Sequence, residues 1–157
     1  MPIKSFRGLI VDNGQDKIIL HTNTGSTGYR IKKFEVISET PGDTADESIL
    51  KIYKVEQLDN IPGGTDLYGK IDFNDQTLIG VGYWSAATSS GSAATMNIIV
   101  ENEIFNQDIY ITHRNISGAS PGDTPCNYYL ELEQVKLDLN ENTVATLKDI
   151  RNETLAV

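Results

Sequence analysis

The sequence predicts an all-β fold, a β-sandwich of jelly-roll or Greek-key type, followed by a short C-terminal helix. Short segments rich in β-branched and aromatic residues alternate with turns that contain glycine and proline, which is the pattern of an all-β protein. The chain lacks the glycine-rich motif and the strand–helix alternation of a dinucleotide-binding fold. After the last such segment, apolar residues recur every three positions, as they do along one side of a helix.

Turn signals divide the chain into its predicted strands. The first strand ends before Asp12–Gly14, the second before Thr24–Gly28 and the third before Pro41–Asp43. Each turn supplies residues that accept or preset the backbone angles of a tight turn, as do those at 62–64 and 121–123. The nine predicted strands are Lys4–Val11, Lys17–Thr22, Tyr29–Ile37, Ser48–Glu56, Leu67–Phe73, Leu78–Trp84, Thr95–Glu101, Asp108–His113 and Asn127–Leu137.

The C-terminal region joins the longest predicted strand, Asn127–Leu137, to the helix. A change of apolar phase along this strand predicts a β-bulge near Glu133–Gln134. The helix of about a dozen residues is too short to be stable alone, so its apolar stripe must rest on another surface. We therefore predict a β-sandwich domain over residues 1–138 and a C-terminal helix and tail over residues 139–157.

The helix could cap the core of its own chain, or it could dock on a neighbouring subunit. We favour docking, because the apolar stripe is narrow and the tail beyond it continues to be apolar. The predicted protein-interface residues are Val144, Leu147, Ile150 and Leu155.

Composition excludes several classes of function. The net charge of −9 argues against binding to nucleic acid, because the sequence offers no stripe of basic residues that could contact a phosphate backbone. No apolar run approaches the ~20 residues of a membrane span, and the N-terminal apolar patch Leu9–Val11 is far shorter than that of a signal peptide. We therefore expect a protein that is made and kept without secretion. Cys126 is the only cysteine, which rules out an intrachain disulfide.

The two histidines, His21 and His113, raise the alternative of a metal site with Asp108 or Glu101. Their spacing is neither H-x-H nor H-E-x-x-H, which argues against a metal site. A Ser–His–Asp arrangement stays open, although no G-x-S-x-G motif marks a nucleophile. The sequence thus predicts a non-enzymatic protein, and no residue is assigned as catalytic, metal-binding or cofactor-binding.

Clustered carboxylates raise the alternative of calcium binding, since Ca²⁺ prefers oxygen ligands. The cluster in the turn before the fourth strand comprises Asp43, Asp46 and Glu47, and Asp138 and Glu141 lie near the C-terminus. Their spacing does not match an EF-hand loop, so we favour solvated acidic turns.

Several stretches of the sequence resemble small, uncharacterised structural proteins of marine tailed bacteriophages. The specific part is the C-terminal third, with "IFNQDIYITHRNI" and "CNYYLELEQVKLDLNENTVATLKDIRN"; "GYRIKKFEVIS", "ILKIYKV" and "LIGVGYW" fit more loosely. The resemblance implies a virion component made in the host cytoplasm, such as a capsid decoration or cement protein. It supplies no motif from which a functional residue could be transferred.

The expected partners are the major capsid protein or another virion protein and further copies of the chain, with a trimer as the working guess. An alternative is a tail-fibre or receptor-binding module that recognises a host surface glycan. Its ligand would lie among the loops Ser85–Thr95 and Gly118–Pro125, with Tyr83 and Trp84 stacking on a sugar. A cellular enzyme with a calcium or histidine site is a third alternative.

Overall fold

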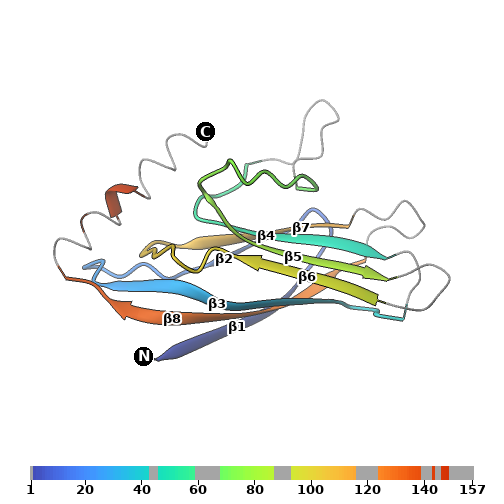
Figure 1. Cartoon of the computed structure of the whole chain (residues 1–157), viewed down its shortest axis with the longest axis horizontal. Helices are drawn as coiled ribbons and strands as arrows, with labels where there is room; N and C mark the ends of the chain where they lie inside the picture. The colour runs from blue at the N-terminus through green and yellow to red at the C-terminus, as the bar shows by residue number, and fades with distance from the viewer. Residues whose placement is uncertain are drawn as a thin grey trace.

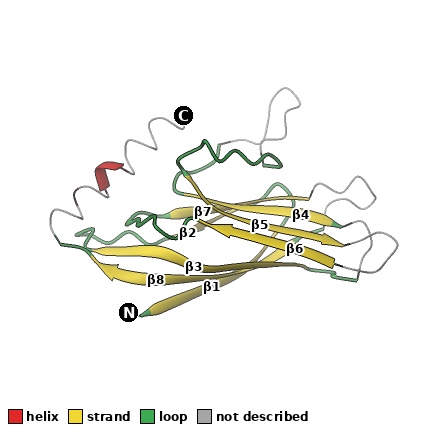
Figure 2. Cartoon of the chain, viewed as in Figure 1, coloured by secondary structure: helices red, strands yellow, loops and turns green. Residues whose placement is uncertain are grey.

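The chain folds as a sandwich of two antiparallel β-sheets in the computed structural model (Figures 1 and 2). The structure describes residues 2–42, 46–58, 68–86, 93–115, 124–138, 143 and 146–148. Within them the strands are β1 (Ile3–Ile10), β2 (Gln15–Ile18), β3 (Thr27–Ser38), β4 (Glu47–Tyr53), β5 (Leu78–Ala86), β6 (Ala93–Ile99), β7 (Ile109–Asn115) and β8 (Cys126–Lys136). The predicted all-β sandwich is confirmed.

The strand order is that of a jelly roll. One sheet has the order β1-β8-β3 and the other has the order β2-β7-β4-β5-β6. Strands from the start of the chain therefore pair with strands from its end, β1 with β8 and β2 with β7. This nesting is how a jelly roll winds one antiparallel ribbon into two sheets.

Strand β6 departs from the regular arrangement. In a regular jelly roll the sixth strand would extend the first sheet beside β3, whereas here β6 is hydrogen-bonded to β5. It still lies next to β3, where Asn97 Nδ2 donates to Glu35 Oε2 over 2.8 Å (Figure 1). No backbone ladder joins β6 to β3 in the described part of the chain, although the backbone of β3 pairs at Tyr29 with Phe105 of the connection that follows β6.

The core lies between the inner faces of the two sheets. Alternate residues point inward along each strand, as in β8, where Tyr128, Leu130 and Leu132 are buried and Tyr129 is exposed. Large core side chains with almost no exposure include Phe34, Ile31, Ile52, Ile111, Leu130 and Leu132. Gly82 allows β5 to approach β3 closely, because a Cβ atom there would lie 2.7 Å from Val36 Cγ1.

One predicted strand, Leu67–Phe73, is wrong. Residue 67 lies outside the described residues, and residues 68–73 form turns and irregular backbone over the outer face of the five-stranded sheet (Figure 1). Side chains replace a strand ladder here: Lys51 Nζ donates to the carbonyl of Lys70, and Tyr68 Oη donates to the carbonyl of Gln57. The chain then turns through Asp72, whose carboxylate accepts from the Asn74 amide.

The predicted bulge is also misplaced. Strand β8 pairs continuously with β1 through Glu133, and the irregularity lies opposite it in β3, between Ile31 and Lys33. Lys32 is the extra residue, and it is exposed. Buried residues alternate without a break along β8 from Cys126 to Leu132. In β3, by contrast, the buried residues change phase from Tyr29 and Ile31 to Phe34 and Val36, on either side of the extra residue.

A short helix follows β8, as predicted. Residues 143 and 146–148 are helical (Figure 2). Thr146 Oγ1 accepts a hydrogen bond from Asn106 Nδ2 over 2.9 Å, and Lys148 Nζ lies 2.8 Å from Glu103 Oε1. These two contacts attach the helix to its own chain, to the connection between β6 and β7.

Candidate functional site

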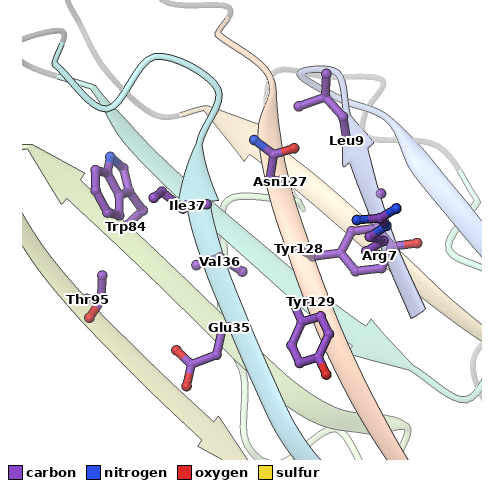
Figure 3. Close-up of a pocket in the computed structure, with 11 residues that line it drawn as sticks. Arg7, Leu9, Glu35, Val36, Ile37, Trp84, Thr95, Asn127, Tyr128 and Tyr129 are labelled. Atoms are coloured by element: carbon purple, nitrogen blue, oxygen red, sulfur yellow. The ribbon is translucent and has the colours of Figure 1, made fainter. Parts of the chain in front are cut away.

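A groove of about 810 Å³ crosses the outer face of the three-stranded sheet and continues around the edge of β3 (Figure 3). It is the candidate functional site. Its lining comes from β1, β8 and β3, with one residue each from β5 and β6. The lining residues are Arg7, Gly8, Leu9, Glu35, Val36, Ile37, Trp84, Thr95, Asn127, Tyr128 and Tyr129.

The outward side chains of the groove form two rows across the strands. Arg7 of β1, Tyr129 of β8 and Glu35 of β3 lie opposite one another in the first row. In the second row, Asn127 lies directly opposite Leu9 of β1 on one side and Ile37 of β3 on the other. Rows arise because directly opposed residues on neighbouring strands point to the same face.

The polar groups of the first row differ in how they are held. Tyr129 Oη donates to Glu131 Oε2 over 2.6 Å, which fixes the phenol ring. This hydrogen bond raises the pKa of Tyr129 and is the largest cause of the shift. Glu35 is held from the other side by Asn97. Among the described residues, no hydrogen bond or ion pair engages the guanidinium of Arg7.

Trp84 closes one end of the groove and is almost completely buried, with 6% of its surface exposed. Its Nε1 atom has no hydrogen-bond partner among the described residues. The adjacent Tyr83 points to the opposite face of the sheet, where its hydroxyl donates to Glu47 Oε1 over 2.7 Å. The predicted sugar platform of Tyr83 with Trp84 is therefore wrong, because neighbouring residues of a strand cannot share a face.

The predicted glycan loops contribute little that can be described. Residues 87–92 of Ser85–Thr95 and residues 118–123 of Gly118–Pro125 lie outside the described residues. Only Thr95, at the end of the first loop, lines the groove.

A second polar cluster is buried at the end of the sandwich where β4, β7 and β8 meet. His113 Nδ1 donates to the carbonyl of Ile10 over 2.9 Å, so its Nε2 accepts from the Ser48 hydroxyl over 3.1 Å. Burial lowers the pKa of His113, against the opposing influence of the Val11 and Ile10 carbonyls. Neither Ser48 nor His113 has any exposed surface, and neither lines the groove.

The same cluster includes Asp46, one of the carboxylates considered for calcium. Its oxygens accept hydrogen bonds from the Ser38 hydroxyl and from Asn115 Nδ2, the latter over 2.7 Å. Cys126, also fully buried, lies beside it, and burial raises the pKa of the thiol to about 12. The polar groups of this cluster are one another's hydrogen-bond partners inside the core, as is usual for buried polar groups.

The other carboxylates and the histidines considered for metal binding do not form one cluster. His21 and Asp108 do meet, since His21 Nδ1 lies 2.7 Å from Asp108 Oδ1, but the ring of His113 is buried against Ile10 and Ser48. Glu101 is exposed. Asp43 and Glu141 lie outside the described residues. In the described part of the chain, no three His, Cys, Asp or Glu side chains gather closely enough to hold a metal ion.

The predicted interface residues are only partly described. Leu147 is 60% exposed, although Thr146 and Lys148 on either side are attached to the body of the chain. Val144, Ile150 and Leu155 lie outside the described residues. The role of all four in an interface stays a prediction.

The fold defines the class of this protein as an all-β sandwich with jelly-roll strand order. No protein-family model, curated protein or solved structure matches the chain. The described part of the chain contains no helix that is long and apolar enough to cross a membrane.

Sequence reasoning missed the groove. Alternation within each strand is a signal that Arg7, Glu35 and Tyr129 point outward. The order of the strands, which brings these three side chains into one row, is a property of the tertiary fold and leaves no mark in any single segment.

Proposed function

We propose that this chain is a non-enzymatic structural protein of a phage virion, a capsid decoration or cement protein that acts through repeated protein–protein contacts. It is made in the host cytoplasm, assembles as a homo-oligomer, with a trimer as the working guess, and attaches to the major capsid protein or another virion protein. The sequence resemblance in the C-terminal third supports the virion assignment. The net charge of −9 fits a surface that avoids the packaged genome.

One observation carries the assembly proposal: Leu147 is held outward. Its two neighbours attach the helix to the chain's own body through Asn106 and Glu103, while Leu147 itself is mostly exposed. A leucine that is anchored but uncovered suits a contact with another subunit, because little conformational entropy remains to be lost on docking.

A second exposed apolar strip supports the same proposal. Met96, Ile98 and Val100 alternate along β6 and the residue after it, and each has at least 40% of its surface exposed. Alternate residues of a strand share a face, so the three side chains form one strip beside an edge of the five-stranded sheet. Contiguous exposed apolar surface is typical of interaction sites.

The experiment is to measure the molar mass of the purified chain by light scattering and its attachment to particles. We expect an oligomer that dissociates in the Leu147→Asp variant and in a chain lacking residues 139–157. Ile19→Asp is the matched control, since Ile19 is exposed and lies outside both surfaces. A wild-type chain that is monomeric and does not bind to capsids would contradict the proposal.

A second candidate function is favoured by the groove of Figure 3. A receptor-binding module needs a hollow with an exposed aromatic ring and convergent polar groups, and Tyr129, Arg7 and Glu35 supply these features. This candidate keeps the chain in the virion and assigns it recognition of a host surface glycan. Binding to immobilised glycans tests it.

A further inference from the structure

The first row of the groove places an aromatic ring between a guanidinium and a carboxylate (Figure 3). We propose that this groove binds an uncharged oligosaccharide, with one sugar ring on Tyr129 and its hydroxyls between Arg7 and Glu35. The proposal rests on the second candidate function, glycan recognition, and names the site and the class of sugar.

Tyr129 supplies the surface on which a sugar can stack. Tyr129 is 37% exposed, on the outer face of the central strand of the three-stranded sheet. The hydrogen bond from its hydroxyl to Glu131 holds the ring in place. An aromatic ring that is already ordered offers a flat apolar face to the C–H groups of a sugar at low entropic cost.

Arg7 and Glu35 supply complementary polar groups on either side of that ring. A guanidinium only donates hydrogen bonds and a carboxylate only accepts them, whereas each sugar hydroxyl does both. Neighbouring strands lie about 4.8 Å apart, so the two side chains flank Tyr129 at a distance that a single sugar ring can span. Arg7 has no competing partner among the described residues, and Asn97 orients Glu35.

The second row extends the groove beyond one sugar unit. The amide of Asn127, which can donate and accept, lies between the apolar side chains of Leu9 and Ile37. Together the two rows contain one positive and one negative side chain, so the lining carries no net charge. This balance favours a neutral sugar over a uronate, which would also be repelled by a chain of net charge −9.

The chain carries its own reporter for the test. Trp84 is the only tryptophan and lies at one end of the groove, so its fluorescence should change as the groove fills. Neutral oligosaccharides and matched uronate-containing ones are first screened on an array. Hits are then titrated against the full chain while Trp84 emission is followed.

We expect saturable binding of a neutral oligosaccharide. Arg7→Gln and Glu35→Gln should each weaken it about tenfold, because each removes a charge-assisted hydrogen bond. Tyr129→Ala should abolish it, and Tyr129→Phe, which keeps the ring but loses the hydrogen bond to Glu131, should bind more weakly than wild type and more tightly than Tyr129→Ala. Lys33→Gln is the matched control, because Lys33 lies on the same outer face of β3 but outside the lining. Circular dichroism establishes that each variant is folded.

The outcomes separate the inference from the functions on which it rests. Binding that survives Arg7→Gln, Glu35→Gln and Tyr129→Ala would overturn the inference and leave glycan recognition to another surface of the protein. A preference for uronates would overturn the assignment of a neutral ligand. Absence of binding to any saccharide would remove both the inference and the second candidate, whereas the assembly proposal is decided separately by light scattering.

Discussion

His113 couples the stability of the fold to pH. Its ring is fully buried, with Nδ1 donating to a backbone carbonyl and Nε2 accepting from Ser48. Burial disfavours the charged ring and lowers the pKa of His113 in the folded state. The unfolded chain therefore binds a proton more readily than the folded chain, so stability is full above the unfolded pKa of about 6.5 and falls as the pH drops below it.

The prediction is a loss of unfolding free energy as the pH falls below about 6.5, measured by urea denaturation at a series of pH values. In a His113→Asn variant the fall over this range should be smaller, whatever its absolute stability. The His21→Asn control keeps His113 and should keep the fall. Equal slopes in wild type and His113→Asn would contradict the assignment.

Trp84 carries a second residue-scale prediction. Its buried Nε1 atom lacks a partner among the described residues, and an unsatisfied buried donor costs about 1–3 kcal/mol. Trp84→Phe removes this donor and keeps an aromatic ring in the core. We expect removal of the unpaired donor to offset most of the packing that is lost with the larger ring, so that the free energy of unfolding changes by about 1 kcal/mol or less. A Trp→Ala change typically costs about 3–5 kcal/mol.

Chemical denaturation of Trp84→Phe and Trp84→Ala side by side makes the comparison. The Phe variant needs far-UV circular dichroism as its probe, because the chain then contains no tryptophan. Similar losses in the two variants would mean that the Nε1 atom has a partner.

At the scale of elements, Glu103 joins the C-terminal helix to the sandwich. It lies between the buried Lys54, 2.5 Å away, and Lys148 of the helix, 2.8 Å away. Burial alone would raise the pKa of Glu103, but hydrogen bonds from Lys148 and Lys54 outweigh it and lower the pKa. The carboxylate of Glu103 therefore forms ion pairs with a lysine of the core and with a lysine of the C-terminal helix at the same time.

Glu103→Gln should lower the free energy of unfolding by about 2–3 kcal/mol, because it takes the charged partner from a lysine inside the protein. Lys148→Gln should cost only about 0–1 kcal/mol, since that side chain is partly exposed to solvent. Urea denaturation of both variants measures the difference. Equal costs would show that Glu103 acts mainly on the helix.

The elements also show how far the sequence could lead. Eight of the nine predicted strands are found, because alternation and turn residues are local signals. The predicted strand Leu67–Phe73 is not found. Its described residues belong to a loop whose backbone carbonyls accept hydrogen bonds from side chains such as Lys51. The bulge predicted in β8 lies in β3, where the buried residues change phase between Ile31 and Phe34. The groove was missed because the order of the strands, which brings its side chains together, is set only by the tertiary fold.

For the whole molecule, the predicted boundary at residue 138 can be tested by truncation. Leu137 is buried, and its amide donates to the carbonyl of Ser26 over 2.9 Å, so it belongs to the sandwich. A chain of residues 1–138 should fold with the same circular dichroism spectrum and a modestly lower melting temperature. A chain of residues 1–125 should not fold, because it lacks the central strand of one sheet. Loss of structure in the longer chain would contradict the boundary.

The position of β8 has a consequence for biosynthesis. Strands β1 and β3 do not pair with each other; both pair with β8, which is translated after all the other strands in the described part of the chain. Until the ribosome has released β8, both earlier strands expose unpaired backbone and one half of the hydrophobic core remains uncovered. Nascent chains in this state are prone to aggregation. Efficient production of this protein should therefore depend on rapid completion of translation or on chaperones that shield the growing chain.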